Sequence, residues 1–292
     1  MQWLVTALGA AIVLFALRDM FHTIWHSSGQ GSLSRVVIEA VWRGSRRLKR
    51  RSKQTSMVGP AALLAVILTW GFTIVAGWTL IYWPHMAEGF SLASGLEPSE
   101  RADFIDSLYL SLVTVATLGY GDIVPTYAWL RLATPFQALI GFALLTAAVS
   151  WILQIYPALA RRRTLALRLA FLSESDAMRT VPTLDSSAGS TLLDSLAAEL
   201  VRVRVDLTQY AETYYFREAD ARTSLPVQLP FALRLAQAAG ASPREDTRLA
   251  ADVLEKAVTD YAHLVTQQFS VTGEDVSVIL QRYADDHGYR VP

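Results

Sequence analysis

The stretch TVATLGYGDIVP, residues 114–125, places two glycines around a tyrosine, with an aspartate directly after them. Runs of apolar residues without charge lie on both sides of it. Glycine at positions 119 and 121 permits positive φ, so the stretch predicts an irregular backbone path rather than a helix or a strand. The role of its polar backbone groups depends on the apolar segments on either side.

The composition indicates a membrane protein. Of the 292 residues, 52% are hydrophobic and 18% are charged, and the absence of cysteine excludes disulfides and thiolate metal sites. Three uncharged runs are long enough to cross a hydrocarbon core of about 30 Å. They are residues 1–17, extending through a mixed segment toward Trp25, then 54–84 and 132–160. We therefore expect three transmembrane helices.

The distribution of charge predicts the topology. Basic residues follow the first and the last span: Arg35, Arg43, Arg46, Arg47, Lys49, Arg50, Arg51 and Lys53, and then Arg161, Arg162 and Arg163. Acidic residues follow the second span: Glu88, Glu97, Glu100, Asp103 and Asp106, against the single Arg101. By the positive-inside rule, this predicts a multi-pass protein of the cell membrane with its N-terminus outside and its C-terminus in the cytoplasm. Trp78, Tyr82 and Trp83 are expected to form an aromatic belt at the outer interface.

The uncharged segment 107–121 is too short to span the membrane. A helix from Ser107 to Ala116 rises about 15 Å, half of the hydrocarbon core. Because the neighbouring spans require it to enter and leave on the outer side, we expect a re-entrant helix followed by a loop at 117–121. Non-helical backbone at that depth is tolerated inside protein or along a water-filled path.

Cations can satisfy the carbonyl groups of this loop. The two glycines allow successive carbonyls to point the same way, and the Thr117 hydroxyl adds a further oxygen. Rings of such oxygens replace the water shell of a weakly hydrated cation, and the C-terminal end of the preceding helix favours positive charge. Since one loop lines only a fraction of a pore, several chains have to meet around an axis.

TLGYGD, residues 117–122, resembles the selectivity-filter signature of potassium channels, usually written T-V-G-Y-G-D, and the resemblance covers about residues 58–160. It implies a homotetramer whose filter, Thr117, Leu118, Gly119, Tyr120 and Gly121, binds dehydrated potassium ions. It further implies support of the filter by Tyr109, Thr114 and Asp122, with a hydrogen bond between Tyr109 and Asp122. Leu118, Val113 and Leu110 depart from the family pattern, so filter-linked inactivation does not carry over.

The span from Ala128 to about Pro157 resembles the inner, pore-lining helix of that family. Gly141 lies where the family carries a hinge glycine, although a close helix–helix contact explains a membrane glycine equally well. Phe142, Leu145, Val149 and Leu153 follow at spacings of three and four residues on one face. We predict that they line the cavity and a hydrophobic gate; a lipid-facing stripe would have the same pattern. No span carries the arginine repeat of a voltage sensor.

Two polar features near the first span are open to more than one interpretation. Asp19, His22 and His26 share a helical face, which suits a divalent metal site, a proton sensor, or polar groups satisfied by neighbouring helices. The basic segment 35–53 is expected to contain an amphipathic helix beside anionic lipid; the alternative is a solvated connector.

Residues 161–292 have the composition of a soluble helical domain. Helices are expected at 191–220, 226–239, 243–268 and 273–285, while VRVRV at 201–205 also suits a strand. No G-x-G-x-x-G follows a strand, so a nucleotide-binding regulatory domain is not indicated. The aromatic segment 210–217 suits core packing or a ligand, and the regulatory ligand is not identified.

The sequence thus predicts an all-α membrane protein with three transmembrane helices, a re-entrant pore helix and filter, and a helical cytoplasmic domain. The expected divisions are 1–27, 28–57, 58–160 and 161–292. The expected function is passive, potassium-selective conduction through a homotetramer, with membrane lipid as a partner and neither nucleic acid nor enzymatic activity involved. The alternatives are a non-selective or silent membrane sensor and a subunit of a potassium transporter.

Overall fold

The computed structural model describes residues 1–25, 31–48, 57–93, 103–269 and 271–289 of the chain. Several residues used in the sequence argument lie outside these ranges. They are His26, the basic residues Lys49, Arg50, Arg51 and Lys53, and the loop residues Glu97, Glu100 and Arg101.

The described chain is almost entirely helical. The helices are α1 (Gln2–Trp25), α2 (Ser32–Leu48), α3 (Val58–Tyr82), α4 (Met86–Gly89), α5 (Asp103–Val115), α6 (Ala128–Glu174), α7 (Ala177–Thr183), α8 (Ala188–Gln209), α9 (Leu225–Ala239), α10 (Glu245–Phe269) and α11 (Val276–Asp286). Short 3-10 turns are η1 (Trp83–His85), η3 (Ala211–Tyr215) and η4 (Ala221–Thr223). The predicted fold class is confirmed, with the addition of two strands, β1 (Phe90–Leu92) and β2 (Ile123–Pro125).

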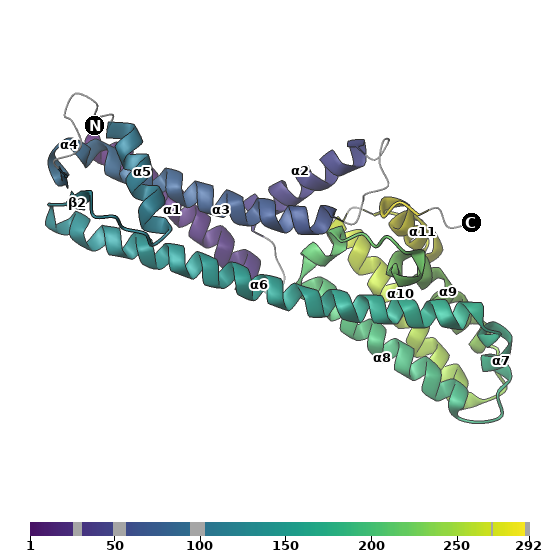
Figure 1. Cartoon of the computed structure of the whole chain (residues 1–292). Coiled ribbons are helices and arrows are strands. Elements are labelled where there is room, and N and C mark those ends of the chain that lie inside the picture. Colours follow the sequence, from purple (N-terminus) through teal and green to yellow (C-terminus); the bar gives the residue numbers. More distant parts are fainter. Residues whose placement is uncertain (26–30, 49–56, 94–102, 270, 290–292) are drawn as a thin grey trace. The chain divides into compact units, whose positions relative to one another are not determined.

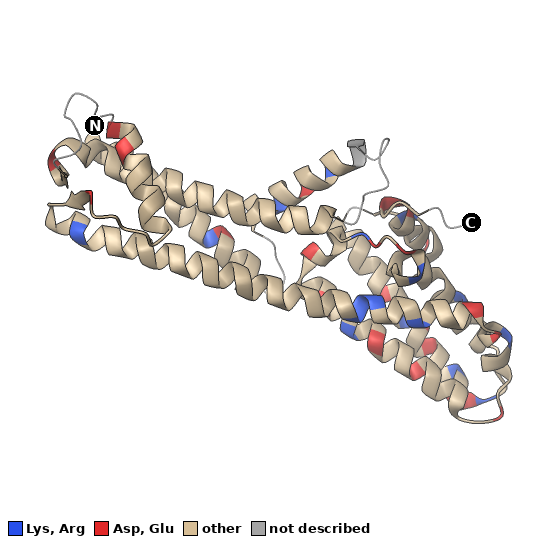
Figure 2. Cartoon of the chain, in the orientation of Figure 1, with Lys and Arg blue, Asp and Glu red and all other residues tan. Residues whose placement is uncertain are grey.

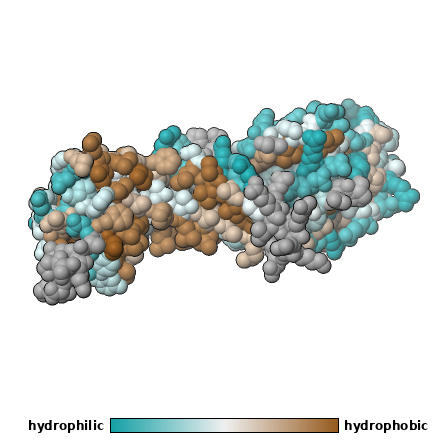
Figure 3. All heavy atoms as spheres, turned by 90° about the horizontal axis from the view of Figure 1, so that it is seen from above, coloured by the Kyte–Doolittle hydropathy of each residue, from teal (hydrophilic) through white to brown (hydrophobic). Residues whose placement is uncertain are grey.

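Three helices have the length and composition of membrane spans. They lie at Gln2–Ile24, Val58–Gly89 and Ala128–Glu174. Charged residues are sparse on α1, α3 and the first half of α6 and dense on the C-terminal helices (Figure 2). Hydropathy follows the same division on the surface seen in Figure 3.

The chain folds into two compact units. The first unit contains Met1–Val41 and Ala61–Leu153, and the second contains Trp42–Pro60 and Gln154–Pro292. Helices α2, α3 and α6 each contribute residues to both units. The domain boundaries expected from the sequence stay a prediction, but α6 continues as one helix through Arg161–Arg163 rather than ending there.

In the first unit, α1, α3 and the first part of α6 lie alongside one another, and α5 lies between α3 and α6 (Figure 1). Glycines allow α1 and α3 to approach closely, because a Cβ on Gly9 would lie 2.4 Å from the carbonyl oxygen of Gly77. The rings of Trp70 (α3) and Trp151 (α6) pack with their centroids 5.5 Å apart. The unit therefore has its own packed core of large side chains.

The expected aromatic belt at the end of α3 is largely absent. Trp78 and Tyr82 are buried within the unit, whereas Trp83 is exposed. Tyr82 is withdrawn from the surface because its hydroxyl bonds to Gln137 of α6.

The second unit is a helical bundle, in which α10 packs against α8 and α9, and α11 packs against α9 and α10. The segment 201–205 is part of α8, so the strand interpretation is wrong. The helix expected at 191–220 ends at Gln209, because the following aromatic residues turn into the core. Tyr214 stacks on Phe269 at a centroid distance of 3.9 Å, and it donates a hydrogen bond to Asp286.

Candidate functional site

The loop that follows α5 is the most unusual backbone in the first unit. Helix α5 ends at Val115, and the loop reverses through residues of positive φ at Thr117 (57°), Gly119 (54°) and Gly121 (79°). A positive φ is ordinary for glycine but strained for a β-branched residue, at a cost of about 1–2 kcal/mol for Thr117. The loop conformation at Thr117 therefore has to be stabilised by contacts with the surrounding residues.

The first amide groups of the loop donate hydrogen bonds to carbonyl groups at the end of α5. The N–H groups of Leu118 and Gly119 both donate to the carbonyl of Val113, at 2.8 and 3.4 Å, and Thr117 donates to Thr114 at 2.9 Å. The carbonyl groups differ: none from Thr117 to Gly121 accepts a hydrogen bond from a described residue. Five successive carbonyl oxygens are therefore available to a ligand.

Positive φ recurs at every second residue of the loop. Leu118 and Tyr120 lie between the positive-φ residues and have negative φ. The loop backbone therefore follows neither a regular helix nor a regular strand. A Cβ on Gly119 or Gly121 would meet no atom within 4 Å, so conformation rather than space explains glycine at both positions.

The outer end of the loop is fixed by a side-chain bond and a two-strand ladder. The Tyr109 hydroxyl of α5 donates to Asp122 Oδ2 at 2.7 Å, which is the pair implied by the family resemblance. Strands β1 and β2 pair antiparallel directly after Asp122, with Ser91 opposite Val124. The amide of Ala93 donates to the carbonyl of Asp122 at 2.8 Å. This ladder is not predictable from the sequence pattern, since each strand has only three residues.

A buried polar network that the sequence did not reveal positions α5 itself. Gln137 of α6 accepts a hydrogen bond from the Tyr82 hydroxyl at 2.7 Å and donates to the Ser111 hydroxyl at 2.8 Å. Ser111 in turn donates to the carbonyl of Val75 at 3.0 Å. The network joins α3, α5 and α6 in an apolar interior, where such bonds fix a unique arrangement.

Gly141 contacts the end of α5. A Cβ at this position would lie 2.1 Å from the carbonyl oxygen of Val115. The close-contact interpretation therefore has direct geometric support, and the hinge role stays a prediction. Phe142, Leu145, Val149 and Leu153 are exposed on a different face of α6.

Asp19, near the end of α1, is engaged by other parts of the first unit, while the metal-site and proton-sensor interpretations of Asp19, His22 and His26 stay predictions. Asp19 is 3% exposed, and its carboxylate accepts hydrogen bonds from the Leu33 and Ser34 amides, the Ser34 hydroxyl and Trp70 Nε1. It thus caps the start of α2 and holds α3 beside it. No group of three or more acidic or histidine side chains that could hold a metal occurs among the described residues, and His26 lies outside them.

Comparison with known proteins agrees with this geometry. Residues 63–156 match the model of a family described as ion channel. The uncharacterized membrane protein YdjJ of Bacillus subtilis (strain 168) is 28% identical over 148 residues, which are 50% of this chain and 42% of YdjJ. Protein LctB of Bacillus caldotenax is 32% identical over 85 residues, which are 27% of this chain and 61% of LctB.

The chain thus spans less than two thirds of the length of either relative. No solved structure matches it. The matched segment contains α5, the loop at 117–121, most of α3 and the first part of α6. Residues 63–156 are therefore similar to an ion channel domain, and the three long apolar helices of the described chain are those of a membrane protein.

Proposed function

We propose that this chain is one subunit of a homotetrameric channel that conducts potassium passively through the loop Thr117–Gly121. The observation that carries the proposal is the row of five carbonyl groups that accept no hydrogen bond from any described residue, in a loop where positive φ recurs at every second residue. Unpaired carbonyls are costly in an apolar environment, and dehydrated potassium ions are the ligands that a stack of carbonyl rings accepts. The ion channel family indicates conduction rather than catalysis.

The exposure of the loop supports assembly into a tetramer. Leu118 is 58% exposed and Tyr120 is 68% exposed, although both are large and lie between buried elements in the sequence. A second chain that packs against them would bury this surface, and symmetric repetition would bring the carbonyls of each copy to one axis.

The distribution of described charges supports the proposed orientation. Glu88, Asp103 and Asp106 lie at the end of the first unit where α3 ends and α5 begins, whereas Arg18 and Arg35 lie where α1 ends and α2 begins. Placing the arginines in the cytoplasm follows the positive-inside rule and puts the loop at the outer side of the cell membrane. The basic helix α2 then lies next to the anionic inner leaflet.

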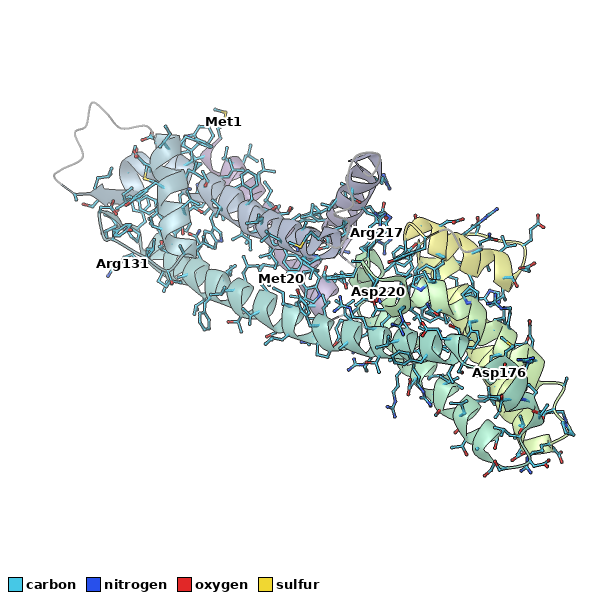
Figure 4. All side chains as sticks on the ribbon, turned by 45° about the vertical axis from the view of Figure 1, so that its right-hand side comes forward. Met1, Met20, Arg131, Asp176, Arg217 and Asp220 are labelled. Atoms are coloured by element: carbon cyan, nitrogen blue, oxygen red, sulfur yellow. The ribbon has the colours of Figure 1, made fainter. Side chains whose placement is uncertain are left out.

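The second unit offers a physical route for regulation. It includes the end of α2 from Trp42, the start of α3 up to Pro60, and the continuation of α6 from Gln154. Trp42 is buried there beneath Arg217, whose guanidinium carbon lies 3.9 Å from the ring centroid, and a Cβ on Gly59 would contact the Phe216 ring (Arg217 is labelled in Figure 4). We propose that changes in this unit move the cytoplasmic ends of α3 and α6 and so gate the pore.

Reversal potentials in a planar bilayer test the proposal, with potassium on one side and sodium on the other. The wild-type chain should reverse near the potassium equilibrium potential. A reversal near zero would indicate a non-selective pore, and the absence of current at either polarity would favour the silent-sensor alternative. A native mass measurement should give four copies; a single copy would contradict the tetramer.

Two glycine variants sharpen this test. Gly119→Ala should abolish selective current, because alanine disfavours φ of 54° although space for its Cβ is free. Gly44→Ala is the matched control, because Gly44 lies in α2 without positive φ and also has free space. Equal selectivity in both variants would mean that the loop conformation does not carry conduction.

A further inference from the structure

A small pocket opens in the first unit between the end of α1 and the start of α2. Its volume is about 250 Å³, and Phe15, Arg18, Asp19, His22, Ser32 and Arg35 line it. Met20, labelled in Figure 4, marks this end of α1. The pocket is too small for an extended organic ligand, since such sites usually measure about 300–1,000 Å³. It does suit a compact anionic group.

The pocket lining carries two arginines and one carboxylate, that of Asp19, so positive charge is in excess. Arg18 and Arg35 are both exposed, and neither guanidinium group has a hydrogen bond or ion pair with a described residue. The carboxylate in the lining, that of Asp19, is directed to the Ser34 hydroxyl at 2.5 Å and to Trp70 Nε1 at 3.0 Å. Because the Asp19 oxygens are engaged by the α2 amides and by Trp70 of α3, the two guanidinium groups have no side-chain partner among the described residues.

An apolar stripe on α1 leads to this pocket. Leu4, Leu8 and Phe15 are 74%, 56% and 44% exposed, and Arg18 follows them on the same face at helical spacing. The face is therefore apolar along the membrane span and cationic at its end. A phospholipid has the complementary pattern, with an acyl chain joined to a phosphate.

We propose that this pocket binds the phosphate group of an anionic phospholipid, whose acyl chain lies along Leu4, Leu8 and Phe15. Arg18 and Arg35 each present a planar donor fork that matches phosphate oxygens, and the Ser32 hydroxyl is available as a further donor. Binding ties α1 to α2 through a shared ligand. Soluble phosphate has the same anionic chemistry, so the experiment distinguishes the two sources. The proposal is independent of the conducted ion.

Lipid binding to the full chain in detergent tests the proposal by native mass spectrometry. Phosphatidylglycerol, phosphatidylcholine and inorganic phosphate are titrated separately. Phosphatidylglycerol should bind more tightly than phosphatidylcholine, and Arg18→Gln or Arg35→Gln should each weaken phosphatidylglycerol binding about tenfold, as expected for one charge-assisted hydrogen bond. Arg35→Lys should restore part of the affinity, because it restores the charge.

Arg43→Gln is the matched control, since it removes the same charge from α2 outside the pocket lining. It should leave phosphatidylglycerol binding unchanged. Equal binding of the two lipids, or an equal loss in Arg35→Gln and Arg43→Gln, would overturn the proposed site in favour of general attraction to a basic helix. Inorganic phosphate that displaces phosphatidylglycerol at comparable concentration would overturn the assignment to a lipid. Retention of the wild-type elution volume by each variant excludes misfolding.

Discussion

At the scale of single residues, the hydrogen bond between Tyr109 and Asp122 joins α5 to the outer end of the carbonyl loop. It measures 2.7 Å and involves a carboxylate, so it is a charge-assisted hydrogen bond. The loop itself contains strained backbone at Thr117.

Tyr109→Phe should therefore loosen the loop and reduce discrimination between potassium and sodium. The reversal potential should move toward zero, while the unfolding temperature changes little because the ring remains. Asp122→Asn keeps an acceptor for the Tyr109 hydroxyl and should have the smaller effect. If Tyr109→Phe keeps the wild-type reversal potential, this hydrogen bond does not contribute to holding the filter.

Gly141→Ala tests the contact between α6 and α5. The new Cβ would lie 2.1 Å from the Val115 carbonyl oxygen, so one helix has to move, and the unfolding temperature of the chain should fall. Gly71→Ala is a suitable control, because its Cβ would meet only Leu144, at an ordinary 3.9 Å. A change of open probability in Gly141→Ala with unchanged thermal stability would favour the hinge.

Residue patterns predicted the glycine loop well but not the groups that hold it. The glycines at 119 and 121 are recognisable in the sequence because their positive φ values disfavour most other residues. The roles of Ser111 and Gln137 are not recognisable, since a single hydroxyl or amide in an apolar helix does not indicate its hydrogen-bond partner. Asp19 formed a recognisable pattern with His22, yet its role depends on amides of α2 that only the fold brings close.

At the scale of elements, α5 is held by bonds to two helices that are distant in sequence. Gln137→Leu removes the acceptor of the Tyr82 hydroxyl and leaves that hydroxyl buried without a partner, at a cost of about 1–3 kcal/mol. The expected result is a lower unfolding temperature. Adding Tyr82→Phe should restore part of the loss, because the unsatisfied group is removed. If the double variant is as unstable as the sum of both single variants, the network is not the cause.

The exposed face of α6 carries the predicted gate. Val149→Asp or Leu153→Asp should hold the pore open, because a carboxylate hydrates a constriction that apolar side chains keep dry. Open probability in bilayers is the measurement. Phe72→Asp on α3 is the comparison, since Phe72 is also exposed. If all three variants only lower the yield of membrane-inserted protein, the face of α6 contacts lipid.

From the sequence, the last span is expected to end at the cluster Arg161–Arg163. The ion pairs of these arginines show that the cluster has a second role. Within the second unit, Arg161 pairs with Asp206 at 2.7 Å, and Arg163 pairs with Glu218 at 2.9 Å. The cluster therefore anchors α6 among the C-terminal helices as well as carrying positive charge. Charge counting cannot separate these two roles, because the acidic partners lie tens of residues away.

At the scale of the whole molecule, α6 contributes a long segment to each unit, with its residues up to Leu153 in the first and those from Gln154 in the second. The stability of that unit is therefore relevant to any signal that α6 transmits. Its core contains ionisable groups that the sequence did not mark as buried. Arg162 of α6 is 4% exposed and donates to the carbonyls of Thr213 and Phe216.

His287 lies in the same core and makes the second unit sensitive to acid. Nε2 of its ring lies 2.7 Å from the Tyr214 carbonyl oxygen, and Nδ1 lies 3.0 Å from that of Tyr283. Burial, assisted by the positive charge of Arg162, lowers the pKa of His287 to about 4. An unfolded chain has a histidine pKa of about 6.5, so the unfolded state binds a proton between these two values that the folded state does not.

Stability of the second unit should therefore fall as the pH drops from about 6.5 to about 4, by a total on the order of 3 kcal/mol, and this loss should end below the lower value. The measurement is the thermal unfolding of the full chain in detergent, followed by circular dichroism at neutral pH and at about pH 5. His287→Gln removes the titrating group while keeping a donor for the Tyr214 carbonyl, so its unfolding temperature should change less between the two conditions. Asp246 does not affect this comparison. Its pairing with Arg244 lowers its pKa to about 2, so the stability that depends on its charge is lost at a more acidic pH. An equal fall in wild type and His287→Gln would assign the acid sensitivity to other groups.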